Sequence, residues 1–245
     1  MAGHSHWSKI KRAKGANDAK RGKIWSKVAR KIIIAAKNGG GDPRENLTLR
    51  YTIEEAKGVN MPRDTIEKAI KKGTGELGAE NYEDALYEAY APGGVAMIIE
   101  ALTNNPSRTA PDLRAVLERN GCNLATRGAV AFQFTKQGII TVKADAVDED
   151  RLMEIALEAG ADDVRNEGEV FEVITSPVAF IKVKEAISAA NVPVEASEIT
   201  QMPNNTIAIG AEAGQKLLKL IDVIEDNDDV QTVSHNAEIP ESVMA

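Results

Sequence analysis

The sequence predicts an α+β protein of three domains, an N-terminal helical domain followed by two ferredoxin-like α/β domains. Three observations predict this. The chain has 245 residues, which is long for one domain. Its apolar residues follow a helical period until about Tyr82, after which short strands alternate with helices. Residues 1–75 contain 18 Lys or Arg and 7 Asp or Glu, whereas the remainder contains 12 and 30, so a basic part precedes an acidic body.

The first domain is predicted at residues 1–78 and contains three helices. On the first of them, apolar residues gather on one side of a helical wheel and cations on the other. Asp42 is the expected N-cap of the second helix, with Pro43 at its first position. The expected helices cover residues 20–37, 42–57 and 62–73.

The acidic body is predicted to consist of two units. One has the order β-α-β-β-α-β, which is the ferredoxin-like arrangement. Its expected elements are strand 138–143, helix 148–159, strands 162–166 and 169–174, helix 177–190 and strand 194–201. The elements left over are strands 85–91, 95–102, 129–134, 206–210 and 229–234 and helices 109–120 and 212–226. Together they would form an open sheet with helices on one face. We therefore predict a discontinuous middle domain, 79–134 plus 205–245, into which a third domain, 135–204, is inserted.

Composition excludes several classes of protein. Cys122 is the single cysteine, so neither a disulfide within the chain nor a Cys-rich zinc site can form. No stretch approaches the roughly 18 apolar residues that a membrane helix needs. The segment from Met1 to Lys14 lacks the apolar centre of a secretory signal. We expect a cytoplasmic protein that contacts no membrane.

A cluster of cations in the first domain predicts phosphate binding. Only Asp18 opposes it, whereas a merely solvated helix face usually mixes both signs. The cluster consists of Lys9, Lys11, Arg12, Lys14, Lys20, Arg21, Lys23, Lys27, Arg30, Lys31 and Lys37. Four of these side chains, Lys20, Lys23, Lys27 and Lys31, are expected to face solvent. Two tryptophans lie among the cations, where an exposed indole could stack on an unpaired base. Trp25 falls on the apolar side and is expected in the core, while Trp7 stays a candidate base contact.

A second candidate lies in the loop from Leu102 to Pro111, between a predicted strand and helix. It combines two asparagines with Ser107, Arg108 and Thr109. Donors near a helix N-terminus suit phosphate, so Arg108 joins the candidate nucleic-acid contacts. Capping of the helix by Ser107 or Thr109 explains the same residues equally well, and both interpretations stay open.

Patterns typical of enzymes and cofactors are weak. His4 and His6 lack further ligands nearby, so we expect no metal. The glycines from Gly73 to Gly78 match a dinucleotide-binding string, but they follow a predicted helix and not a strand. Nothing indicates that Cys122 has a catalytic base. We expect no catalytic residues, no cofactor and no small-molecule substrate.

Six segments resemble the YebC/PmpR family, and the match is dense over the first 134 residues. They are AGHSHWSKIK (2–11), DAKRGKIWSKVARKI (18–32), GGGDPRENLTLR (39–50), AKGVNMPRDTIEKAIKKG (56–73), YEAYAPGGVAMIIEALTNNPSRTA (87–110) and NGCNLATRGAVAFQF (120–134). Arg12 and Trp25 stand where the family often has His and Phe, which keeps charge and aromaticity. The resemblance implies three domains, the first of them helical.

The resemblance implies a non-enzymatic regulator. Bacterial members of the family are described as DNA-binding transcriptional regulators of the cytoplasm, whereas mitochondrial relatives activate translation and some bacterial relatives act on ribosomes stalled on proline-rich stretches. We therefore expect a transcriptional regulator that binds DNA through its basic N-terminal domain. The alternative is a ribosome-associated translation factor that contacts rRNA or tRNA. An enzyme with a cleft between domains and a protein–protein adaptor are further alternatives, but no catalytic constellation favours the first of these.

Overall fold

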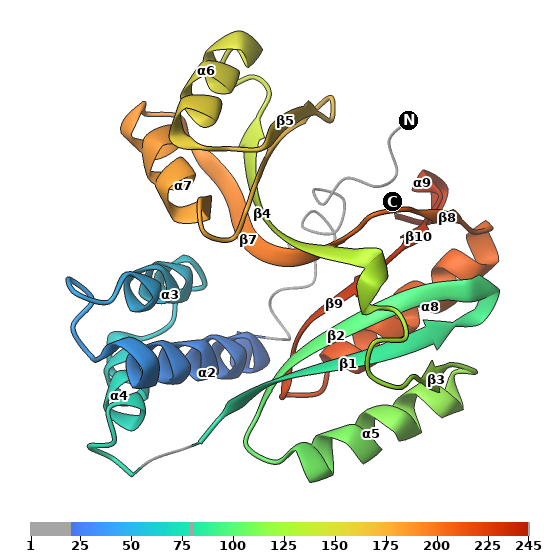
Figure 1. Ribbon diagram of the computed structural model, residues 1–245. Helices are drawn as coiled ribbons and strands as arrows, with labels where there is room; N and C mark the ends of the chain where they lie inside the picture. Colours follow the sequence, from blue (N-terminus) through green and yellow to red (C-terminus); the bar gives the residue numbers. More distant parts are fainter. Residues whose placement is uncertain (1–20, 79–80, 245) are drawn as a thin grey trace.

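The computed structural model of the protein describes residues 21–78 and 81–244 (Figure 1). It confirms the predicted fold class: a helical N-terminal part precedes two parts that each contain an antiparallel sheet. The three parts lie around a common centre, toward which the paired strands β4 (Phe134–Lys143) and β7 (Val194–Pro203) run from the upper part of the view (Figure 1).

The helical part consists of α2 (Arg21–Gly39), α3 (Leu47–Gly58) and α4 (Arg63–Gly73). Its core is aliphatic, with Val28 and Ile32 of α2 packed among residues of the other two helices. Leu49 and Ile66 contribute from α3 and α4. Trp25 packs against this cluster, as predicted, and its indole N–H donates to the Val59 carbonyl at 3.0 Å.

The start of α3 differs from the prediction. Its N-cap is Asn46 and not Asp42, because Asn46 can donate as well as accept. The side-chain oxygen of Asn46 accepts from the Leu49 N–H at 3.0 Å, and its amide donates to the carbonyls of Ala35 and Gly40 at 2.7 and 2.8 Å. Asn46 thereby ties the end of α2 to the start of α3. The carboxylate of Asp42 instead holds Arg44 within the connecting turn.

The middle sheet has the strand order β3-β1-β2-β9. Its strands are β1 (Glu83–Ala91), β2 (Val95–Thr103), β3 (Asn123–Leu124) and β9 (Val230–His235), with a short 3₁₀ turn, Pro92–Gly94, between the first two. Helices α5 (Pro106–Arg119) and α8 (Ala211–Glu225) cover one face through a shared aliphatic core. The antiparallel pairing of β9 with β2 brings the C-terminal part of the chain back to the first two strands of this sheet.

Two strand predictions in this part are wrong. The strand predicted at 129–134 does not form: the 3₁₀ turn Ala131–Gln133 takes its place, and Phe134 already belongs to the next strand. The buried Glu88 carboxylate holds the chain before that turn through the N–H groups of Gly128, Val130 and Ala131, at 2.5, 2.6 and 2.8 Å. The strand predicted at 206–210 is only β8 (Ile207–Ala208). It pairs with β10 (Ala237–Glu238) in a separate two-stranded sheet, and the short helix α9 (Glu241–Met244) follows.

The third part has the predicted order of elements. They are β4 (Phe134–Lys143), α6 (Glu149–Ala159), β5 (Asp163–Asn166), β6 (Val170–Thr175), α7 (Phe180–Ala189) and β7 (Val194–Pro203). The strand order is β5-β6-β4-β7, and every pair is antiparallel. This is the ferredoxin-like arrangement. The domain boundaries at 78, 134 and 204 stay a prediction.

Candidate nucleic-acid interface

The predicted phosphate-binding residues fall into two groups. Trp7, Lys9, Lys11, Arg12, Lys14 and Lys20 lie outside the described residues. Of the others, Arg21 begins α2, where Lys23, Lys27, Arg30 and Lys31 follow it, and Arg108 lies in the first turn of α5.

Three cations form one row along α2, since they are spaced at i, i+4 and i+7. We call Lys23, Lys27 and Arg30 the α2 cation row. They face the segment 225–229 that joins α8 to β9, which we call the acidic turn. The Lys23 ammonium lies 3.0 Å from the Asp226 carboxylate. The Lys27 ammonium donates to the carbonyl of Glu225 at 2.9 Å. Both lysines therefore meet the C-terminal end of α8, where unpaired carbonyls and the helix dipole attract cations.

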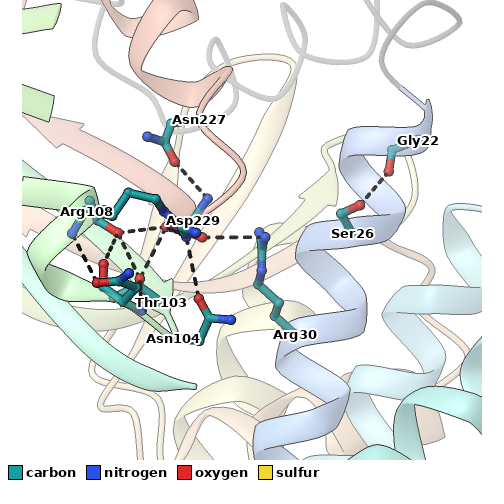
Figure 2. A network of polar contacts seen from close by, with 10 residues as sticks. Gly22, Ser26, Arg30, Thr103, Asn104, Arg108, Asn227 and Asp229 are labelled. Carbon is teal, nitrogen blue, oxygen red and sulfur yellow. Dashed lines mark hydrogen bonds and ion pairs between the residues drawn. The ribbon is translucent and has the colours of Figure 1, made fainter. Parts of the chain in front are cut away.

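Asp229 is the centre of this contact (Figure 2). One carboxylate oxygen lies 3.5 Å from the guanidinium of Arg30 on α2. The other accepts from the Arg108 guanidinium at 2.7 Å and from the Thr109 hydroxyl at 2.7 Å, both on α5. The Thr103 hydroxyl, at the end of β2, is 3.2 Å away. Since its side chain is only 5% exposed, Asp229 is a buried anion that two arginines neutralise and two hydroxyls hydrogen-bond.

The environment of Asp229 keeps it ionised. Burial alone would raise the pKa of this carboxyl, but hydrogen bonds from Thr109 and Arg108 and the charges of Arg108 and Arg30 outweigh burial. The pKa of Asp229 is therefore below its usual value. The Arg30 side chain is itself only 14% exposed, and its guanidinium also lies 5.5 Å from the centre of the Tyr82 ring.

The lysines of α2 that the sequence places toward solvent have partners in the folded chain, although the Lys23 side chain stays 46% exposed. Lys23 and Lys27 contact the acidic turn, and the Lys31 ammonium lies 2.7 Å from the Glu55 carboxylate of α3. The sequence-based interpretation missed these contacts because their partners lie up to 203 residues away along the chain.

Arg108 lies near the helix N-terminus, but a different residue caps that helix. Asn105 is the N-cap of α5, and its side-chain oxygen accepts from the Arg108 N–H at 3.2 Å. Neither Ser107 nor Thr109 is the N-cap, so the capping interpretation named the wrong residues. The Arg108 side chain is 52% exposed while it holds Asp229, which leaves part of the guanidinium open to solvent.

Other cations of the helical part are exposed. Lys57, Lys68 and Lys71 make no ion pair with any residue that the structure describes. Lys37 is also exposed and donates to the side chain of Asn81 at 3.0 Å. These side chains can meet phosphate without losing an internal ion pair.

A second contact joins the helical part to the third part. Glu185 of α7 accepts from the Tyr51 hydroxyl at 2.7 Å and from the Arg50 guanidinium at 2.8 Å, both on α3. Burial and the hydrogen bond to Glu185 raise the pKa of Tyr51 to about 12. The Lys184 ammonium lies 5.2 Å from the centre of the same ring. The helical part is thus held on two sides.

The described residues were searched for a metal site and for a catalytic site. Within the described ranges, no group of His, Cys, Asp and Glu side chains could hold a metal ion, and no helix is long and apolar enough to cross a membrane. A cavity of about 430 Å³ opens between α2, α3 and the ends of β1 and β2. Its lining includes Lys31, Ile34, Thr52 and Asp84, among which no nucleophile with an activating base occurs.

Comparison with known proteins settles the family. The model of the TACO1/YebC protein N-terminal domain matches residues 5–76, and that of the TACO1/YebC second and third domain matches residues 82–237. The chain belongs to the TACO1/YebC family. The chain is similar to a crystal structure of a conserved hypothetical protein from Aquifex aeolicus, with a TM-score of 0.87, 45% identity, and coverage of 98% of this chain and 100% of that chain.

Curated relatives of this TACO1/YebC chain share its full length. One from Acidithiobacillus ferrooxidans is 51% identical over 245 residues, which cover 100% of this chain and 98% of that protein. Another from Treponema denticola is 50% identical over 241 residues, 98% of each chain. Both are named "probable transcriptional regulatory protein".

Proposed function

We propose that the protein is a non-enzymatic regulator that binds DNA through its basic N-terminal part and acts on transcription. The observation that carries this proposal is the division of charge. Residues 1–75 carry a net charge of +11, while the rest of the chain carries −18. Cations release counterions when they neutralise phosphates, and the acidic body repels nucleic acid, so a polyanion is directed to the N-terminal part. The names of the relatives support a regulatory role.

The exposed cations of the helical part would contribute contacts to phosphate. Lys37, Lys57, Lys68 and Lys71 point to solvent on three different helices. Such contacts position a protein on nucleic acid but carry no sequence information. Base-specific contacts would have to come from other residues.

A second candidate function is a ribosome-associated translation factor that contacts rRNA or tRNA. The placement of α2 favours it. One side of this helix packs in the core, and its cation row meets the acidic turn, so α2 is not presented as a helix that reads a major groove. RNA binding through phosphate contacts and base stacking needs no such helix.

Crosslinking in growing cells separates the two candidates. The tagged protein is crosslinked, and the DNA and RNA recovered with it are sequenced together. Discrete promoter peaks with ribosomal RNA at background support the transcriptional regulator. Enrichment of rRNA or tRNA over DNA supports the translation factor, and recovery of neither nucleic acid above an untagged control contradicts both.

A further inference from the structure

We propose that the acidic turn, residues 225–229, is an internal competitor of nucleic acid for the α2 cation row. The inference rests on the proposed function, because it assumes that the N-terminal part binds phosphate. It adds a closed state, in which part of the phosphate-binding surface is occupied by the protein itself.

The first argument is that the acidic turn contacts the same atoms that phosphate would contact. The ammonium groups of Lys23 and Lys27 and the guanidinium of Arg30 each meet an oxygen of the turn, at 3.0, 2.9 and 3.5 Å. Each oxygen belongs to a carboxylate or to a carbonyl at the negative end of a helix, so it presents negative charge as a phosphate oxygen does. A phosphate and the turn cannot occupy these cation positions together.

The second argument is that the contact is graded in strength along α2. The Lys23–Asp226 pair is 46% and 48% exposed, so solvent screens it and it opens easily. The Arg30–Asp229 pair is 14% and 5% exposed, and it stays closed because a separated Asp229 would be a buried anion with fewer partners. Nucleic acid would therefore displace the turn from Lys23 first, while Arg30 keeps the two parts together.

A matched pair of variants tests the competition. Asp226→Asn removes the partner of Lys23, whereas Asp228→Asn removes the same charge from the same turn at an exposed residue that has no ion pair within the described chain. The affinities of both variants and the wild type are measured for a fluorescent 30-bp DNA duplex and a 30-nt RNA. We expect Asp226→Asn to bind about two- to fivefold more tightly than Asp228→Asn, which is the range of an exposed ion pair.

Hydrogen exchange of the acidic turn gives an independent readout. In the closed state the Asp226 N–H donates to the Asp222 carbonyl at 3.0 Å, and the Asn227 N–H to the Ile224 carbonyl at 3.1 Å. Bound nucleic acid should speed exchange at Asp226 and Asn227 of the wild type, whereas Asp229 keeps its partners. Equal affinities of the two variants together with unchanged exchange would overturn the competition while leaving the proposed function intact. Absence of binding by all three proteins would overturn both.

Discussion

Two buried carboxylates, Asp229 and Glu88, determine how the loops of the middle sheet are held. Asp229 is neutralised by two arginines and accepts hydrogen bonds from two hydroxyls, whereas Glu88 accepts three backbone N–H groups from one loop. Both are ionised, because hydrogen bonds to the charged form outweigh burial and lower the pKa of each carboxyl. Sequence alone could not identify either role, since Glu88 and Asp229 accept hydrogen bonds from groups 42 and 121 residues away along the chain.

Asp229→Asn should lower the free energy of unfolding by roughly 3 kcal/mol, because Arg30 and Arg108 lose a buried partner. The pH dependence follows from the lowered pKa. The stabilisation by Asp229 is complete above its unfolded-state pKa of about 4 and is lost as pH falls through the lower folded-state pKa. Urea denaturation from pH 7 to pH 2.5 should show a shallower acid decline for the variant. An acid decline as steep as that of the wild type contradicts this role.

Glu88→Gln should destabilise the protein by about 3 kcal/mol, because the new amide group cannot accept the N–H groups that the second carboxylate oxygen holds. Glu83→Gln is the control, since Glu83 is exposed on the same strand. Thermal unfolding of both variants measures the difference. If the two melting temperatures agree, the loop does not depend on the Glu88 charge.

At the scale of elements, close contact between α2 and α4 organises the helical part. A Cβ atom on Gly73 would collide with the Ile33 carbonyl oxygen and would lie 2.7 Å from the Ala36 side chain. Gly73→Ala should therefore destabilise the protein by about 1–3 kcal/mol through overpacking. Gly58→Ala is the matched control, because Gly58 ends α3 as Gly73 ends α4 but has open space around it. Chemical denaturation should leave the control unchanged or slightly more stable, and equal losses for both variants would contradict the close contact.

Element types were predictable where local pattern decides them. The three described helices of the N-terminal part and the β-α-β-β-α-β order follow from periodicity and turn residues. The strand predicted at 129–134 was wrong because Glu88 holds this segment as a loop, in which Val130 is buried without strand pairing. The sequence did not predict Asn46 as the N-cap of α3, because the contact of its side chain with the Ala35 carbonyl of α2 forms only in the folded chain.

At the scale of the whole molecule, the helical part is joined to the body by the acidic turn at α2 and by Glu185 at α3. The charge division that suggested phosphate binding was visible in the sequence, because it needs only counting. The contact of the α2 cation row with the acidic turn was not visible in the sequence, because the partners come together only in the folded chain.

The contact between α3 and α7 should be weak. Arg50 and Glu185 are 43% and 54% exposed, so a double-mutant cycle of Arg50→Ala and Glu185→Ala should give a coupling energy below about 1 kcal/mol. Stability measured by urea denaturation for the four proteins of the cycle checks this. A coupling of several kcal/mol would mean that the third part, and not the acidic turn, fixes the position of the helical part.

The most direct test of nucleic-acid binding by the basic N-terminal part is the salt dependence of affinity. Dissociation constants for a DNA duplex and a single-stranded RNA are measured between 50 and 200 mM salt. Three proteins are compared: the wild type and two variants in each of which five cations are replaced by Glu. One reverses Lys9, Lys11, Arg12, Lys14 and Lys20, and the control reverses five exposed cations of the acidic body, Arg151, Arg165, Lys182, Lys216 and Lys219.

The account predicts that wild-type affinity for at least one of the two nucleic acids falls at least about a hundredfold over this range, as expected when several phosphates are neutralised. The N-terminal reversal should abolish binding, and the control should weaken it far less. Affinity that is independent of salt, or equal losses in the two reversals, would contradict the assignment of phosphate binding to the N-terminal part.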